Sequence, residues 1–135
     1  EPKCLSRQLY GFENTEHTIN NEGPYAFYYH NKIYLAYSGG DARGYLYAIG
    51  MLTANDGDDL CDLSVWEKAK TPIASFATIP GEYGPGHNSF FWDRDQNLWI
   101  AYHAVTSFEE KIVSSGMRRV YFEQDKTPRF DVIVE

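Results

Sequence analysis

The chain makes a rigid turn in the stretch Tyr83-Gly84-Pro85-Gly86-His87-Asn88-Ser89-Phe90. Two glycines around a proline fix a tight path for the backbone. The alternation that begins at Ser89 and continues through Trp92 is typical of a β-strand. The imidazole of His87, held on so rigid a turn, is well placed to point at a ligand. The alternative interpretation is a histidine that only forms hydrogen bonds with neighbouring loops.

The strand after this turn belongs to a hairpin that repeats an earlier one. The hairpin at residues 89–102 matches that at residues 26–37 in strand length, turn position and aromatic content. The two lie about 64 residues apart, which exceeds the roughly 40–50 residues of common propeller repeats because a long loop separates them. Sheets repeated around an axis form a propeller. A sandwich or a meander fits the number of strands equally well.

Strand patterns dominate the chain, and helical periodicity is nearly absent. We therefore predict one all-β domain over residues 1–135, with two blades of about four strands each, at about residues 19–76 and about residues 88–134. The predicted strands are residues 24–29, 32–38, 45–53 and 73–76 in the first blade and residues 88–92, 97–104, 117–123 and 128–134 in the second. A polar excursion is predicted at residues 105–115.

Composition and charge exclude two classes of protein. The net charge is -7 and no basic run exceeds Arg118-Arg119, which argues against a nucleic-acid surface. No apolar stretch approaches the roughly 20 residues of a membrane span, so no membrane partner is expected. Aromatic residues make up 16% of the chain, which suits both a β-rich core and stacking on the apolar faces of sugars.

The N-terminal residues and the two cysteines say less about location and function. The first residues, Glu1-Pro2-Lys3-Cys4, do not form a signal peptide. Because the first residue is not methionine, processing or truncation is favoured, and a secreted or periplasmic location is preferred to a cytoplasmic one. Cys4 and Cys61 leave open whether a disulfide forms. No CxxC or HExxH spacing is present, so a zinc site has no local support.

Three segments, in this order, resemble glycoside hydrolase family 43. They are Asn21-Glu22-Gly23-Pro24 with the strand at residues 32–38 after it, the stretch at residues 52–72, and Gly84-Pro85-Gly86-His87-Asn88-Ser89-Phe90 with Trp99-Ile100-Ala101-Tyr102-His103-Ala104 after it. The match is collinear over about residues 19–104 and continues toward Asp131. Several motifs in order and at matching spacing are more specific than any one alone.

The resemblance implies a five-bladed β-propeller of the arabinofuranosidase or xylosidase type, of which this chain is the C-terminal portion. It implies inverting hydrolysis of arabinose- or xylose-containing glycans, with Glu22 as the general acid. It places His87 near the propeller axis, where members of the family often hold a calcium or sodium ion, directly or through water; no cofactor is required. His87 and Tyr83 are the candidate substrate-binding residues.

A general acid alone does not make such an enzyme. Inverting hydrolysis needs two carboxyl groups about 6.5–9.5 Å apart, one to protonate the leaving oxygen and one to activate water. In the family the general-base aspartate and the aspartate that tunes the acid lie on earlier blades, and no residue here matches them. Five aspartates lie in predicted loops, where a solvated role is the simpler interpretation: Asp41, Asp56, Asp58, Asp59 and Asp62.

Two functional hypotheses therefore stand side by side. In the first, the chain is part of a glycoside hydrolase that is completed by an N-terminal portion supplying the base. In the second, it is a non-catalytic half-propeller that self-associates or binds carbohydrate. Two blades leave sheet faces and edges unburied, so a homo-oligomer, such as a homodimer, or a complementary propeller chain is expected in both cases. The simplest alternative for Glu22 is a solvent-exposed turn glutamate.

Overall fold

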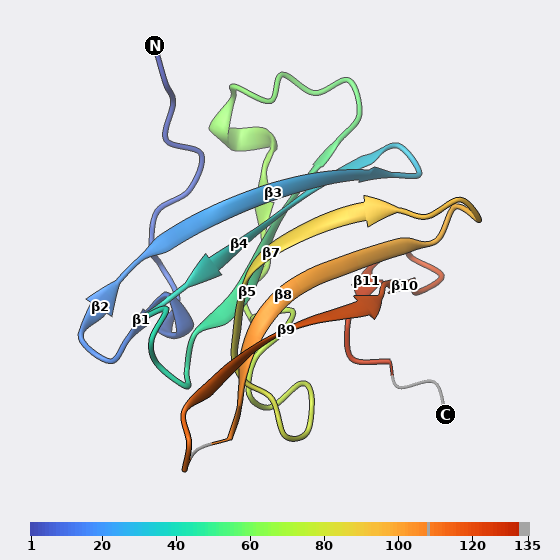
Figure 1. The fold of residues 1–135 in the computed structure, drawn as a ribbon. Helices are drawn as coiled ribbons and strands as arrows, with labels where there is room; N and C mark the ends of the chain where they lie inside the picture. Colours follow the sequence, from blue (N-terminus) through green and yellow to red (C-terminus); the bar gives the residue numbers. More distant parts are fainter. Residues whose placement is uncertain (108, 133–135) are drawn as a thin grey trace.

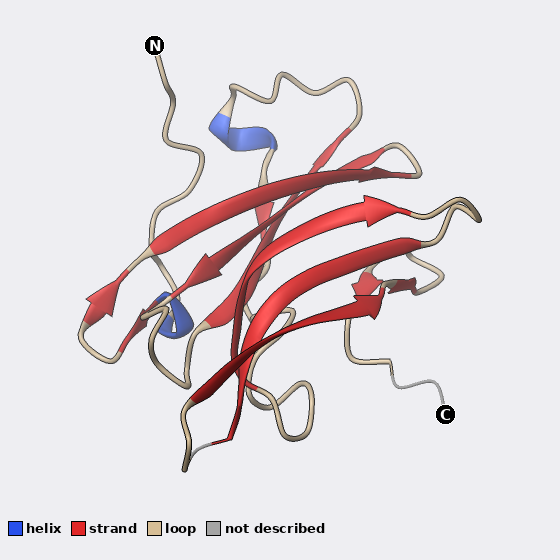
Figure 2. Cartoon of the chain, in the orientation of Figure 1, coloured by secondary structure: helices blue, strands red, loops and turns tan. Residues whose placement is uncertain are grey.

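A computed structural model describes residues 1–107 and 109–132. Two antiparallel sheets make up most of it, and the only helical segments among these residues are two short 3-10 turns, η1 (Gly11–Glu13) and η2 (Leu63–Val65) (Figure 2). The first sheet has the order β3 (Asn21–Tyr29), β4 (Lys32–Gly39), β5 (Ala48–Asn55) and β6 (Glu67–Lys68). The second has the order β7 (Tyr83–Trp92), β8 (Leu98–Ser107) and β9 (Ile112–Arg119).

Two minor hairpins complete the secondary structure. They pair β1 (Asn14–Thr15) with β2 (Thr18–Ile19), and β10 (Tyr121–Phe122) with β11 (Pro128–Arg129). No helix in the described part of the chain is long and apolar enough to cross a membrane. The predicted all-β architecture of propeller-type sheets is confirmed, while the division into blades at residues 19–76 and 88–134 stays a prediction.

Several strand predictions need correction. The polar excursion at residues 105–115 is wrong, because β8 continues to Ser107 and β9 already begins at Ile112. In the described sheet β9 is an edge strand with mostly exposed side chains, which include the apolar Val113 and Met117 beside its serines. The outer strand of the first sheet is β6, and Ala74 contributes only an isolated bridge to Ile49. Of the predicted strand at residues 128–134, β11 is the described part, and residues 133–134 lie outside the described residues.

The inner strands β3 and β7 lie side by side and run in the same direction, as the blue and yellow arrows of Figure 1 show. Alternate residues of both sheets point into the space between them, and the rings of Phe27 and Phe90 meet there with centroids 4.6 Å apart. Tyr34 stacks on Phe27 at 5.0 Å. Burying a ring of this size contributes roughly 1.5–3 kcal/mol. The core thus fixes how the two inner strands are placed relative to each other.

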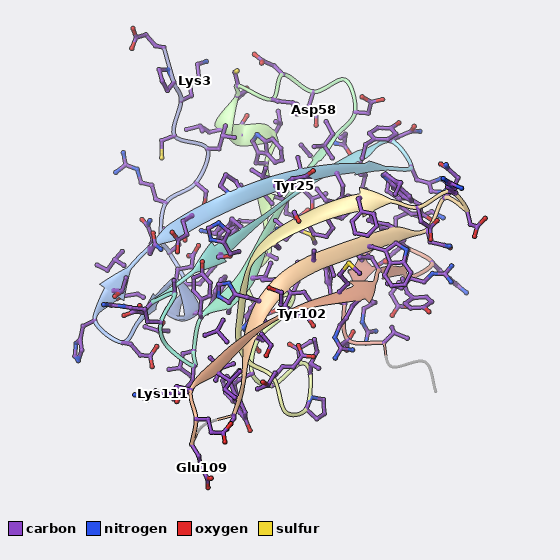
Figure 3. All side chains as sticks on the ribbon, viewed as in Figure 1. Lys3, Tyr25, Asp58, Tyr102, Glu109 and Lys111 are labelled. Atoms are coloured by element: carbon purple, nitrogen blue, oxygen red, sulfur yellow. The ribbon has the colours of Figure 1, made fainter. Side chains whose placement is uncertain are left out.

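A polar network holds the loop that leads into β7. Tyr102 on β8, labelled in Figure 3, donates a hydrogen bond from its hydroxyl to Glu82 Oε2 at 2.6 Å. Arg118 on β9 donates to Glu82 Oε1 at 2.6 Å and to the Tyr102 hydroxyl at 2.7 Å. Burial raises the pKa of Tyr102 to about 12, and the hydrogen bond to Glu82 adds to the shift. Tyr102 therefore remains a donor, and the loop that leads into β7 is held against β8 and β9.

The N-terminal segment is fixed to the first sheet by one buried carboxylate. Glu13 is fully buried, and its carboxylate lies 2.5 Å from the Lys68 ammonium. It also accepts hydrogen bonds from the Tyr37 hydroxyl and from the backbone N–H groups of Leu9 and Tyr10. Burial alone raises the pKa of Glu13, but the contact with Lys68 and these hydrogen bonds outweigh it, so the pKa is lowered below its ordinary value.

Candidate functional site

Glu22 and the His87 turn lie at the same end of the molecule. Glu22 is the second residue of β3 and His87 lies in the first half of β7, and the two strands are neighbours (Figure 1). Between them lies Gly23, whose φ of +55° is the left-handed conformation that glycine adopts freely. A Cβ atom at Gly23 would stand 3.8 Å from Cγ and Nδ1 of the His87 ring. The fold therefore brings the two sequence motifs together.

Tyr47 positions the carboxylate of Glu22. Its hydroxyl donates a hydrogen bond to Glu22 Oε1 at 2.8 Å, and the Tyr47 side chain is fully buried just before β5. Burial raises the pKa of Tyr47 far above its ordinary value; a hydrogen bond with Ser38 opposes this shift, and the neighbouring Glu22 adds to it. The hydroxyl therefore keeps its proton at any working pH and remains a permanent donor to Glu22.

The backbone of His87 is held in an uncommon conformation. Its φ is +52°, which costs energy for a residue with a side chain and is worth relating to function where it occurs. Irregular pairing with β8 lies on both sides of Gly86, so His87 belongs to a bulged part of β7. Its backbone N–H donates to the buried hydroxyl of Ser38 at 2.8 Å. These features turn the imidazole outward, and the side chain is exposed.

His103 joins this site, although it was not among the candidate site residues of the sequence. It lies within β8 opposite Gly86. Its ring stacks on Tyr47 at 5.8 Å and faces His87 at 6.3 Å. Burial lowers the pKa of His103, with a further contribution from His87, while the charge of Glu22 acts against both. The neutral imidazole is favoured, and the hairpin register, which pairs His103 with the glycine before His87, is the signal that could have found it.

Gly86 has no side chain, and the Tyr47 ring occupies the space that a side chain at this position would fill. A Cβ atom at Gly86 would overlap that ring. We expect Gly86→Ala to push Tyr47 away from Glu22 and to lower the free energy of unfolding by about 1–3 kcal/mol, as overpacking does. Urea unfolding measures this. Gly116→Ala is the matched control, because nothing lies within 4 Å of a Cβ atom there. Equal stability of the two variants would contradict the contact.

Tyr83, the other candidate for substrate binding, begins β7 and is half-buried. Its ring stands 6.2 Å from Tyr45 in an edge-on arrangement. Tyr83 thus lies on the same strand as His87 and at the same end of the sheet. Its role in binding stays a prediction.

The described residues offer no ready-made site for a calcium or sodium ion. In the described residues 1–107 and 109–132, no group of three or more His, Cys, Asp or Glu side chains gathers closely enough to hold a metal ion. His87 and His103 offer imidazole nitrogens, whereas calcium prefers a shell of oxygen ligands. The hydrolysis proposed for this site uses no metal, and the ion at His87 stays a prediction.

Asp41 is the loop aspartate that follows the first hairpin, and it already has partners. Hydrogen bonds from the Arg43 side chain and backbone lower the pKa of Asp41 to about 2, and Thr18 contributes. The structure gives no reason to appoint it as a catalytic base. Cys4 and Cys61 are both exposed and unpaired, which answers the question the sequence left open.

Comparison with known proteins gives one family. A model described as glycosyl hydrolases family 43 matches residues 4–128. An extracellular exo-alpha-(1->5)-L-arabinofuranosidase of Streptomyces avermitilis is 29% identical over 98% of this chain and 29% of the relative. A protein of the same name from Streptomyces chartreusis is 37% identical over 74% of this chain and 30% of the relative. The chain thus spans less than a third of the length of these curated relatives.

Solved structures agree with this result. The crystal structure of an alpha-L-arabinofuranosidase from Lactobacillus brevis superposes with a TM-score of 0.84 at 28% identity, over 96% of this chain and 42% of that chain. A thermostable family-43 glycoside hydrolase gives a TM-score of 0.66 at 29% identity, over 84% of this chain and 36% of that chain.

Proposed function

The chain belongs to glycosyl hydrolases family 43, and from this premise we propose that it carries the proton-donor part of an inverting hydrolase of arabinose- or xylose-containing glycans. Glu22 is the general acid, and His87 and Tyr83 contact the sugar. Tyr47 is a positioning residue, since it acts through Glu22. The family resemblance and the names of the relatives support the substrate class.

The observation that carries this proposal is the hydrogen bond from Tyr47 to Glu22 beside the His87 turn. A proton donor must be held in one orientation toward the glycosidic oxygen. A buried tyrosine that never loses its proton provides such a hold on one carboxyl oxygen, Oε1. The second oxygen, Oε2, is then the one that faces the leaving group. A solvent-exposed turn glutamate would need no buried partner of this kind.

A second carboxylate must come from outside residues 1–135. We infer that another propeller sheet supplies the general base at about 6.5–9.5 Å from Glu22. The outer face of the second sheet is a candidate surface for such a sheet, because it exposes apolar side chains from two strands, Phe91, Val113 and Met117. These side chains share one face by the register of β7, β8 and β9.

A chimera tests the proposal. In it, this chain replaces the matched part of the Streptomyces avermitilis arabinofuranosidase, so that the relative supplies the remaining blades. We expect the chimera to release a pentose from an α-1,5-linked arabino-oligosaccharide or from a β-1,4-linked xylo-oligosaccharide with inversion at the anomeric carbon, as proton NMR of the first product reveals. A folded chimera that releases no pentose, or a product of retained configuration, would refute it.

A second candidate function is a non-catalytic half-propeller that self-associates. The exposed Phe91, Val113 and Met117 favour it, because an apolar face of this kind also suits a second copy of the chain. The chimera separates the two candidates, since the module predicts no release of a pentose. We further propose a secreted location, because two relatives are named as extracellular enzymes.

A further inference from the structure

An open hollow lies at the end of the inner strands remote from Glu22 and His87. It has a volume of about 580 Å³ and is lined by the tips of both hairpins: Tyr28, Tyr29, His30, Asn31, Trp92 and Gln96. The seven residue-to-residue steps along β3 from Glu22 to Tyr29 place it roughly 23 Å from the candidate acid, at about 3.3 Å per step. Its size lies within the roughly 300–1,000 Å³ of small-ligand pockets.

The hollow combines exposed rings with amide groups. Tyr28 is 49% exposed and Trp92 is 41% exposed, although both are large and partly apolar. Asn31 and Gln96 bring side-chain amides, and none of the six lining residues is a carboxylate, a lysine or an arginine. His30 is the one lining residue that can carry a charge near neutral pH, and Asp56 contacts the Tyr28 hydroxyl at 3.3 Å, so the hollow carries no cluster of like charges for an ionic ligand. Aromatic faces beside amide donors and acceptors suit a ligand with apolar C–H faces and many hydroxyl groups.

The walls of the hollow are already fixed in this chain. The Tyr29 ring stacks on Phe122 at 3.6 Å and lies 6.2 Å from Trp92 at an angle of 23°. The Tyr28 hydroxyl donates to Asn31 Oδ1 at 3.0 Å. Both hairpins that form the hollow are present, so it does not depend on a missing sheet. Rings held in place before binding lose little freedom when a ligand arrives.

We propose that this hollow is a second carbohydrate site, which binds a neutral oligosaccharide chain on the side of the propeller opposite Glu22. Sugar rings stack on Trp92 and Tyr28, and Asn31 and Gln96 bond to hydroxyl groups. The choice of arabinan or xylan chains as ligands rests on the proposed function. The site would hold the polymer near the enzyme while its chain ends are hydrolysed elsewhere.

Titration of the unmodified chain with α-1,5-arabinopentaose and β-1,4-xylopentaose, followed by calorimetry and tryptophan fluorescence, tests this inference. We expect one of the two to bind, and Trp92→Ala to raise its Kd at least tenfold. Phe91→Ala is the matched control, because Phe91 is the adjacent residue and is 43% exposed, but lies outside the hollow. Its Kd should stay within twofold of that of the unmodified chain.

Two further variants keep the test decisive. Gln96→Gly removes the amide without strain, because Gln96 has a φ of +61°, and should weaken binding several-fold even if Trp92→Ala misfolds. Glu67→Gln, on β6 and outside the hollow, should leave the Kd unchanged. The inference is overturned if neither pentaose binds. It is also overturned if Trp92→Ala and Gln96→Gly bind as tightly as the unmodified chain. Because this readout needs no hydrolysis, an active chimera without such binding would refute this site alone.

Discussion

Replacing Glu22 with glutamine in the chimera is expected to lower kcat for an unactivated arabino-oligosaccharide by about 10²–10⁴-fold, the usual contribution of a general acid. Glutamine keeps the shape and the hydrogen bond that Tyr47 donates to Oε1. It has no carboxylic proton to give to the leaving oxygen. KM should change little, because binding of the sugar ring does not require that proton. Steady-state kinetics of the folded chimera measure both constants.

The matched control for this prediction is Glu67→Gln, an exposed glutamate on the outer strand β6. It should leave kcat unchanged, and both variants should unfold at the temperature of the parent chimera. If Glu22→Gln kept a third or more of the parent kcat, Glu22 would not be the general acid.

Replacing Lys68 with methionine should lower the free energy of unfolding at pH 7 by about 3–5 kcal/mol, because it leaves the buried Glu13 carboxylate without its counter-ion. Lys68 is 10% exposed and also donates to the backbone carbonyl of Arg7. The N-terminal segment should detach first. Urea unfolding gives the change in stability, and hydrogen exchange at residues 9–13 locates it.

The pH dependence of this loss of stability distinguishes a broken buried ion pair from lost packing. The pKa of Glu13 is lowered in the folded chain, so its stabilisation is present above the unfolded value of about 4.3 and is lost as the pH falls through the folded pKa. Without Lys68, burial dominates and raises the pKa of Glu13. The Glu13 carboxyl of the variant therefore takes up a proton as the pH falls, and the variant regains stability relative to the unmodified chain. The difference between the two proteins should narrow from pH 7 to about pH 4.

An exposed ion pair provides the control for Lys68→Met. Arg43 contacts Asp41 at 3.1 Å, but its side chain is 89% exposed. Arg43→Met should have little measurable effect, because solvent screens such pairs. If both variants lost the same stability, or if the loss in Lys68→Met did not depend on pH, the account of Glu13 would be wrong.

The repeated hairpin could be predicted from the sequence because its signal is local. Strand alternation, turn residues and aromatic content lie within residues 26–37 and 89–102, and the structure places strands at both. The first part of β9, residues 112–116, and the late start of β5 were not predicted, because tertiary pairing extends or trims a strand regardless of its own pattern.

The contacts that complete the site are not local. Tyr47 and Glu22 lie 25 positions apart, and Tyr37 reaches Glu13 over 24 positions. The sequence around each of these residues does not indicate that they form pairs. Glu13 in particular looks like an ordinary surface glutamate in the sequence, although it is fully buried. The packing of the two sheets shows that Gly86 leaves room for Tyr47, and the pairing of β7 with β8 places His103 opposite Gly86.

The leaving-group dependence of the Glu22→Gln chimera shows whether Glu22 is the general acid. A dinitrophenolate leaves without being protonated, whereas the alkoxide of a sugar does not. If Glu22 donates the proton, the dinitrophenyl glycoside should lose less than about tenfold in kcat, while the arabino-oligosaccharide loses about 10²–10⁴-fold. An equal loss on both substrates would show that Glu22 only shapes the site, and no loss on either would remove it from the chemistry.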